Sequence, residues 1–252
     1  MDPYSWTWNG EALVLVPLLA IAYAVAVRVY PASRARVASF ALALGLMLAV
    51  FATPVQTIAL HYLLTAHLLQ NVVMAEWAPA LIVFALPPAL AGTLGRASAV
   101  RTLSRPVVAL PLWLGTYFAW HVPIAYDFAL NHPVTALHLE HLSYLAAGIA
   151  LWWPMLQDVP QRLTNGAKAA YVFAAFVLGS PLGLLLALLP SAVYRIYRDG
   201  PGLWGLGPLS DQQLAGLTMA GEQAVVFFAV FAVFFLRFLR EEEARGTTLS
   251  RG

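Results

Sequence analysis

The chain has 252 residues, of which 61% are hydrophobic and 10% charged, and its mean hydropathy is +0.74. This composition lies far from that of soluble domains and predicts a protein embedded in a lipid bilayer. The net charge of +2 and the sequence pI near 9.0 call for no nucleic-acid partner, because membrane proteins concentrate Lys and Arg in their cytoplasmic loops. The absence of cysteine excludes disulfides, thiolate metal ligands and haem attached through thioethers.

An all-α membrane domain covering residues 1–252 is predicted from the apolar runs. A helix needs about 20 mostly apolar residues to cross the hydrocarbon core. Seven segments meet this length, and we expect a bundle of seven transmembrane helices: 11–30, 37–57, 61–88, 107–125, 136–156, 168–190 and 213–237.

Basic residues predict the orientation of this bundle, because they favour the cytoplasmic side. They follow the first, third, fifth and seventh predicted helices, and only Arg195 and Arg198 fall on the other side. The N-terminus is therefore expected outside and the C-terminus inside. The longest connection, 191–212, is expected outside, and Pro79 is expected to kink the 61–88 helix.

All six histidines fall on the predicted outer side. We expect His61 and His132 to be packing or interfacial residues. The other four predict a shared metal site, because neutral imidazole is the commonest protein ligand for transition metals. These candidate metal ligands are His67, His121, His138 and His141.

Further polar or soft side chains are expected near this site. Asn71 and Met74 share a helix face with His67 at spacings of four and seven residues. Methionine thioether favours Cu(I), so copper is the expected ion. The last helix contributes the remaining candidate cofactor-binding residues, which are Asp211, Gln212, Met219 and Glu222.

Two acidic residues are interpreted differently. Glu140 lies between His138 and His141 in the sequence and is expected on another face of the 136–156 helix. Glu76 lies in the middle of the 61–88 helix and is either a protonated core acid or part of a proton path.

Five short blocks resemble the CtaG-type family of bacterial cytochrome c oxidase assembly factors. They are Ala66–Gln70, Trp120–Pro123, His138–Ser143, Trp152–Pro154 and Pro208–Gly216. The likeness extends over about residues 55 to 220. The chain departs from the family pattern where Leu68, Asn71 and Val72 replace two methionines and a histidine, and where Ala220 replaces a tryptophan.

This resemblance implies a non-enzymatic role in maturing a haem-copper oxidase, with copper held or delivered at the outer face. Oxidase subunits and a copper chaperone would be the partners, and the oligomeric state stays open. One alternative is an integral subunit of a respiratory complex with haem or quinone. Others are a scaffold without metal and a metal or proton transporter that uses Glu76 and Glu222. The sequence contains no His-Glu-x-x-His motif and no Gly-x-Ser-x-Gly motif.

Overall fold

The computed structural model describes residues 2–249, with side chains described as far as 245. This part of the chain is helical and contains no β-strand apart from an isolated bridge between Leu203 and Leu206. The prediction of an all-α fold is therefore confirmed. Two five-residue segments, η1 and η2, are π-helical. The elements in chain order are η1 (Glu11–Leu15), α1 (Val16–Val29), α2 (Arg34–Phe51), α3 (Pro54–His61), α4 (Leu64–Val72), η2 (Val73–Trp77), α5 (Ala78–Ala85), α6 (Pro88–Leu94), α7 (Ser98–Leu103), α8 (Pro106–Trp120), α9 (Pro123–Asn131), α10 (Ala136–Leu156), α11 (Asn165–Leu188), α12 (Arg195–Arg198) and α13 (Pro208–Leu249).

Five helical segments of the described chain are long and apolar enough to cross a membrane, or six if the bent pair α8 and α9 forms one span. They are Glu11–Val29, Arg34–Phe51, Leu64–Ala85, Asn165–Leu188 and Pro208–Arg245. The predicted span 136–156 is α10, which has 21 residues, but its first turns carry His138, Glu140 and His141. These side chains lower the hydropathy of a helix that lies inside the bundle. The count of seven and the orientation in the membrane stay predictions.

Several predicted helix boundaries are wrong, and the expected 213–237 helix begins at Pro208 and extends to Leu249. The expected 37–57 helix ends at Phe51, and the Thr53 hydroxyl accepts from Val55 N–H to start the separate helix α3 at Pro54. His61 therefore ends α3 and does not begin a transmembrane helix. The expected 107–125 helix stops at Trp120, and α9 continues at 73° to α8. Proline at the first turn of α3 and of α9 suits a helix start, because that N–H would have no intrahelical partner.

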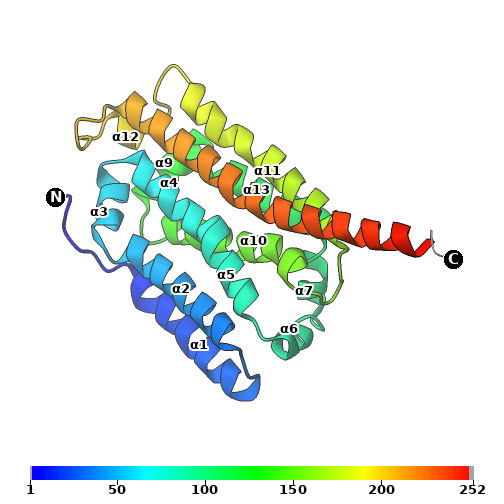
Figure 1. Cartoon of the computed structure of the whole chain (residues 1–252). Coiled ribbons are helices and arrows are strands. Elements are labelled where there is room, and N and C mark those ends of the chain that lie inside the picture. The colour runs from blue at the N-terminus through cyan, green and yellow to red at the C-terminus, as the bar shows by residue number, and fades with distance from the viewer. Residues whose placement is uncertain (1, 250–252) are drawn as a thin grey trace.

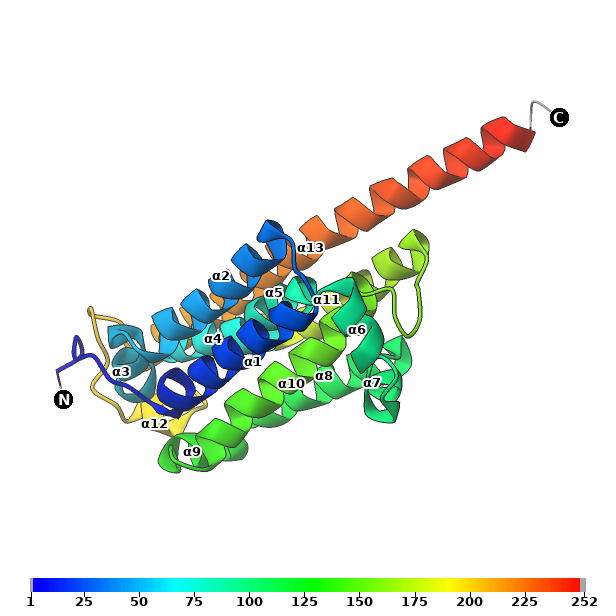
Figure 2. The same ribbon diagram turned by 90° about the horizontal axis from the view of Figure 1, so that it is seen from below.

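The helices form an elongated bundle in which α4, η2 and α5 run beside α10 and α13 (Figures 1 and 2). One end of the bundle, which we call the histidine end, carries α3, α9 and α12, and the opposite end carries α6 and α7. The described chain begins at the histidine end, and α13 projects beyond the opposite end. The histidines lie on the elements that meet at the histidine end: α3, α4, the break between α8 and α9, the end of α9 and the start of α10.

Close backbone packing sets the position of α10 against the helix that carries His67. A Cβ atom added to Gly148 would lie 2.3 Å from the carbonyl oxygen of Ala75 and 2.6 Å from Cγ of Pro79. Pro79 has no N–H to donate to that carbonyl, and the π-helical segment η2 directly precedes this region. The predicted distortion at Pro79 thus takes the form of a π-helical segment on which α10 packs.

Candidate functional site

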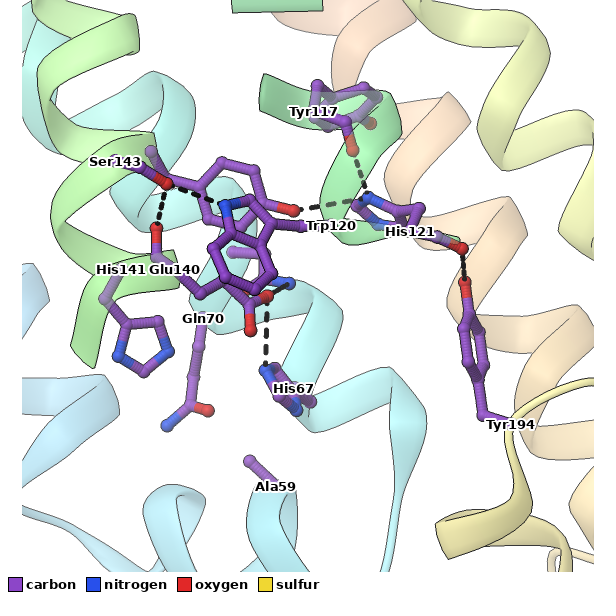
Figure 3. A network of polar contacts seen from close by, with 12 residues as sticks. Ala59, His67, Gln70, Tyr117, Trp120, His121, Glu140, His141, Ser143 and Tyr194 are labelled. Carbon is purple, nitrogen blue, oxygen red and sulfur yellow. Dashed lines mark hydrogen bonds and ion pairs between the residues drawn. The ribbon is translucent and has the colours of Figure 1, made fainter. Parts of the chain in front are cut away.

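Three buried histidines from different elements come together near the histidine end. His67 lies on α4, His121 at the break between α8 and α9, and His141 on α10, and all three are buried. The ring centroids of His67 and His141 are 6.2 Å apart. The ring of Tyr126 lies 5.1 Å from that of His67 and 6.0 Å from that of His121. We call His67, His121 and His141 the inner histidines (Figure 3).

Hydrogen bonds fix the proton position on two of these rings. His121 Nδ1 lies 2.7 Å from the carbonyl oxygen of Tyr117, and a carbonyl can only accept. His141 Nδ1 lies 2.7 Å from Oε1 of Glu11, which accepts in the same way. In the neutral form each Nδ1 therefore carries the proton, and each Nε2 presents a lone pair.

His67 takes the same tautomer for a less direct reason. Its Nδ1 lies 2.8 Å from the hydroxyl oxygen of Tyr197, and that hydroxyl donates its own proton to the carbonyl of Ala59 at 2.6 Å. Burial raises the pKa of Tyr197 far above its ordinary value, so the phenol keeps its proton. His67 Nδ1 must then be the donor, and its Nε2 also carries a lone pair. The connection between α11 and α13 supplies this tyrosine.

The Nε2 atoms of all three inner histidines are buried and find no hydrogen-bond partner among the described residues. A buried polar atom without a partner costs about 1–3 kcal/mol, so such atoms call for an explanation. Metal-binding histidines show this arrangement, because one nitrogen binds a second-shell oxygen while the other faces the ion. The donor set is therefore chemically suited to a transition-metal ion.

Glu140 gives the inner histidines a neighbouring carboxylate that the sequence interpretation did not include. Its Oε1 lies 4.0 Å from His67 Nε2 and accepts a 3.1 Å hydrogen bond from Asn71 (Figure 3). Glu140 was expected on a different face of α10 from His138 and His141. Because α10 is buried on most of its circumference, that face also lies inside the bundle. The sequence did contain a signal for Glu140, because it is an acidic residue between two histidines in an apolar helix.

His138, the fourth predicted ligand, is half-buried, and its link to the inner histidines runs through Glu11. Its Nδ1 is 2.6 Å from Oε1 of Glu11, the same oxygen that binds His141. Within the described chain, the one group with three ligand atoms all within 4.8 Å of one another is Glu11, His138 and His141. The sequence interpretation missed Glu11, because 127 residues separate it from His138.

The predicted residues of the last helix divide between two places. Glu222 accepts from the indole N–H of Trp77 and neighbours the carboxyl group of Glu76. Glu76 in turn accepts from Gln223 at 2.8 Å, and Gln223 also donates to Tyr117. Met74 and Met219 are fully buried. Their cofactor roles, and those of Asn71 and Glu222, stay predictions.

Asp211 and Gln212 make contacts that hold the histidine end together. Asp211 accepts from the backbone N–H groups of Leu64 at 2.6 Å and Thr65 at 3.1 Å, and so caps α4 from another helix. Gln212 accepts from Val193 N–H and donates to the carbonyls of Leu186 and Ser191. These contacts position α4 and the connection that carries Tyr197. A direct cofactor role for either residue stays a prediction.

Replacing Asp211 with alanine is expected to lower the free energy of unfolding by about 1–3 kcal/mol, because two N–H groups at the start of α4 lose their acceptor. Thermal unfolding of the detergent-purified protein measures this loss. Asp199→Ala is the matched control, since Asp199 is exposed and bonds only to its neighbour Arg198 among the described contacts. Equal melting temperatures for the two variants would contradict the capping role.

The fold and the site define a polytopic helical membrane protein with a buried imidazole cluster at one end of its bundle. The family model described as cytochrome c oxidase caa3 assembly factor matches residues 20–241, and the chain belongs to this family. The predicted family is thereby confirmed, and the family indicates a non-catalytic role with oxidase-related partners. No curated protein and no solved structure matches the chain.

Proposed function

We propose that this assembly factor holds copper at its inner histidines for delivery to the oxidase in a bacterial cell membrane. The observation that supports this most directly is the set of three buried, unpartnered Nε2 atoms on His67, His121 and His141. Their tautomers are set by second-shell oxygens, so each ring presents a lone pair. The three Nε2 atoms are not all within 4.8 Å of one another, so the rings must move closer together to share one ion at bonds of about 2 Å. In this proposal copper is cargo that the protein receives and releases.

The chemistry and burial of these residues are compatible with Cu(I). Neutral imidazole nitrogens suit copper, and burial in an apolar bundle limits access of water and oxidants. The carboxyl group of Glu140 lies next to His67, where its ionised form would offset the charge of a bound cation in a low-dielectric interior. Delivery would take place at the histidine end, which the arginine distribution predicts to face the outside. An oxidase subunit and a copper chaperone are the proposed partners there.

Cu(I) binding by the detergent-purified chain tests this proposal. The His67→Gln, His121→Gln double variant removes two of the three lone pairs, and we expect its affinity for Cu(I) to fall by about a hundredfold or more. Competition with a chromophoric Cu(I) chelator measures the affinity. The wild-type chain is expected to bind one ion.

His132→Gln is the matched control, because His132 is exposed at the same end of the bundle and bonds to the carbonyl of Phe128. Unchanged Cu(I) affinity in the double variant would overturn the proposal. Absence of Cu(I) binding by the wild-type chain would favour a metal-free scaffold. A haem absorbance spectrum in the purified protein would instead favour a respiratory subunit.

A further inference from the structure

A groove in the side of the bundle leads to Glu11 and His138. It has a volume of about 390 Å³ and runs between the η1–α1 segment and α10, with Leu18 and Leu142 among its apolar walls. A second cavity of about 250 Å³ is also lined by Gly10 and His138, and its lining includes Gln56. His138 thus lines two open spaces, whereas the inner histidines are buried.

Glu11 joins His138 to His141 through a single carboxylate oxygen, at 2.6 and 2.7 Å from their Nδ1 atoms. The side chain of His138 is 31% exposed, while those of Glu11 and His141 are 2% and 0% exposed. The second oxygen of Glu11 is buried and has no partner among the described residues. Gly10 leaves room for the His138 ring, since an added Cβ there would lie 3.1 Å from two of its atoms.

We propose that Glu11, His138 and His141 form a second metal site, which takes a divalent transition-metal ion of borderline softness, Zn²⁺ or Cu²⁺. Two imidazoles and a carboxylate are the ligand types that such ions prefer, and the three ligand atoms lie within 4.8 Å of one another, so small shifts bring them to the spacing of ligands on one ion. The triad contains no thioether, which is the ligand type that favours Cu(I), so we expect no preference for Cu(I) at this site. We call this triad the groove site.

His141 couples the groove site to the inner histidines through its two nitrogens. Its Nδ1 faces Glu11, and its Nε2 belongs to the inner set. When Nδ1 binds an ion in the groove, the proton of the neutral ring moves to Nε2, which then offers no lone pair to the inner set. Occupation of one site through His141 therefore disfavours occupation of the other.

This exclusion would make the groove site a loading position from which the inner histidines receive an ion. That role rests on the proposed function, whereas Zn²⁺ binding by the triad does not. Glu11 precedes the segment that the family model matches, so the groove carboxylate is a feature of this chain outside residues 20–241.

Zn²⁺ titration of the detergent-purified full chain by calorimetry tests the groove site. We expect Glu11→Gln and His138→Gln each to weaken Zn²⁺ binding by about tenfold or more, because each removes one ligand. His132→Gln is expected to keep the wild-type affinity, since His132 is exposed and does not belong to the triad. Thermal unfolding without metal, together with the rise in melting temperature on adding Zn²⁺, separates lost binding from lost folding.

A competition experiment tests the coupling through His141. Saturating Zn²⁺ is expected to weaken Cu(I) binding to the wild-type chain by about tenfold or more, and to leave Cu(I) binding to Glu11→Gln unchanged. Unchanged Zn²⁺ affinity in both groove variants, or no Zn²⁺ binding by the wild type, would overturn the groove site. Simultaneous full binding of both ions would overturn the exclusion. Zn²⁺ binding in a chain that takes no Cu(I) would support the groove site while removing the proposed function.

Discussion

Replacing Tyr197 with phenylalanine is expected to weaken Cu(I) binding by about ten- to a hundredfold, equivalent to about 1.4–2.7 kcal/mol, although Tyr197 is not a proposed ligand. Its hydroxyl donates to Ala59 and accepts from His67 Nδ1. Without that oxygen, the ring of His67 loses the contact that fixes both its tautomer and its orientation. The same chelator competition that measures the inner histidines measures this effect.

Tyr171→Phe provides a matched control for that experiment. The Tyr171 hydroxyl is also buried and donates to a backbone carbonyl, that of Leu151 at 3.1 Å, but no histidine accompanies it. Both variants are expected to lose about 1 kcal/mol of stability from the missing hydrogen bond. Only Tyr197→Phe is expected to lose Cu(I) affinity. Equal Cu(I) affinities in the two variants would contradict the assignment of the His67 tautomer.

Local sequence signals explain which parts of the fold could be predicted. The α10 segment was predicted with its observed bounds, Ala136 to Leu156, because its apolar run is flanked by polar connections. The breaks before Pro54 and Pro123 were missed, although proline at the start of a helix marked both. In each case the apolar run continues across the break, so hydropathy alone joined two helices that the backbone separates.

The candidate site could be predicted only as a set of residue types. The histidines were recognisable because imidazoles in apolar segments are costly and therefore informative. Their division into an inner set and a groove pair depends on Glu11, which reaches His138 and His141 from the first helical segment. Contacts of this range follow from the packing of α1 and α2 against the rest of the bundle. No local pattern around residue 11 specifies them.

Gly148→Ala is expected to lower the free energy of unfolding towards the upper end of the 1–3 kcal/mol that overpacking usually costs, that is, by about 3 kcal/mol. The added methyl would lie 2.3 Å from a backbone oxygen, about 1 Å short of ordinary contact. Because the obstacle is the backbone at Ala75 and the ring of Pro79, no side-chain rotation relieves it. Thermal unfolding and the monodisperse yield in detergent measure the loss.

If α10 moves away from η2 to relieve this contact, side chains of the proposed copper site also move apart. The helix α10 carries Glu140 and His141, and the helix that begins with α4 carries His67 and Asn71. Any Gly148→Ala protein that folds is therefore expected to bind Cu(I) more weakly than the wild type. A longer distance between α10 and η2 would break the hydrogen bond from Asn71 to Glu140, which is 3.1 Å long.

Gly115→Ala in α8 is the control with the opposite expected sign. An added Cβ there meets nothing within 4 Å, so the substitution is expected to stabilise the helix by about 0.4–1 kcal/mol. If Gly148→Ala instead melted with or above Gly115→Ala, α10 would not lie against η2 as closely as described. The juxtaposition of His67 with Glu140 and His141, on which the proposed copper site depends, would then have to be abandoned.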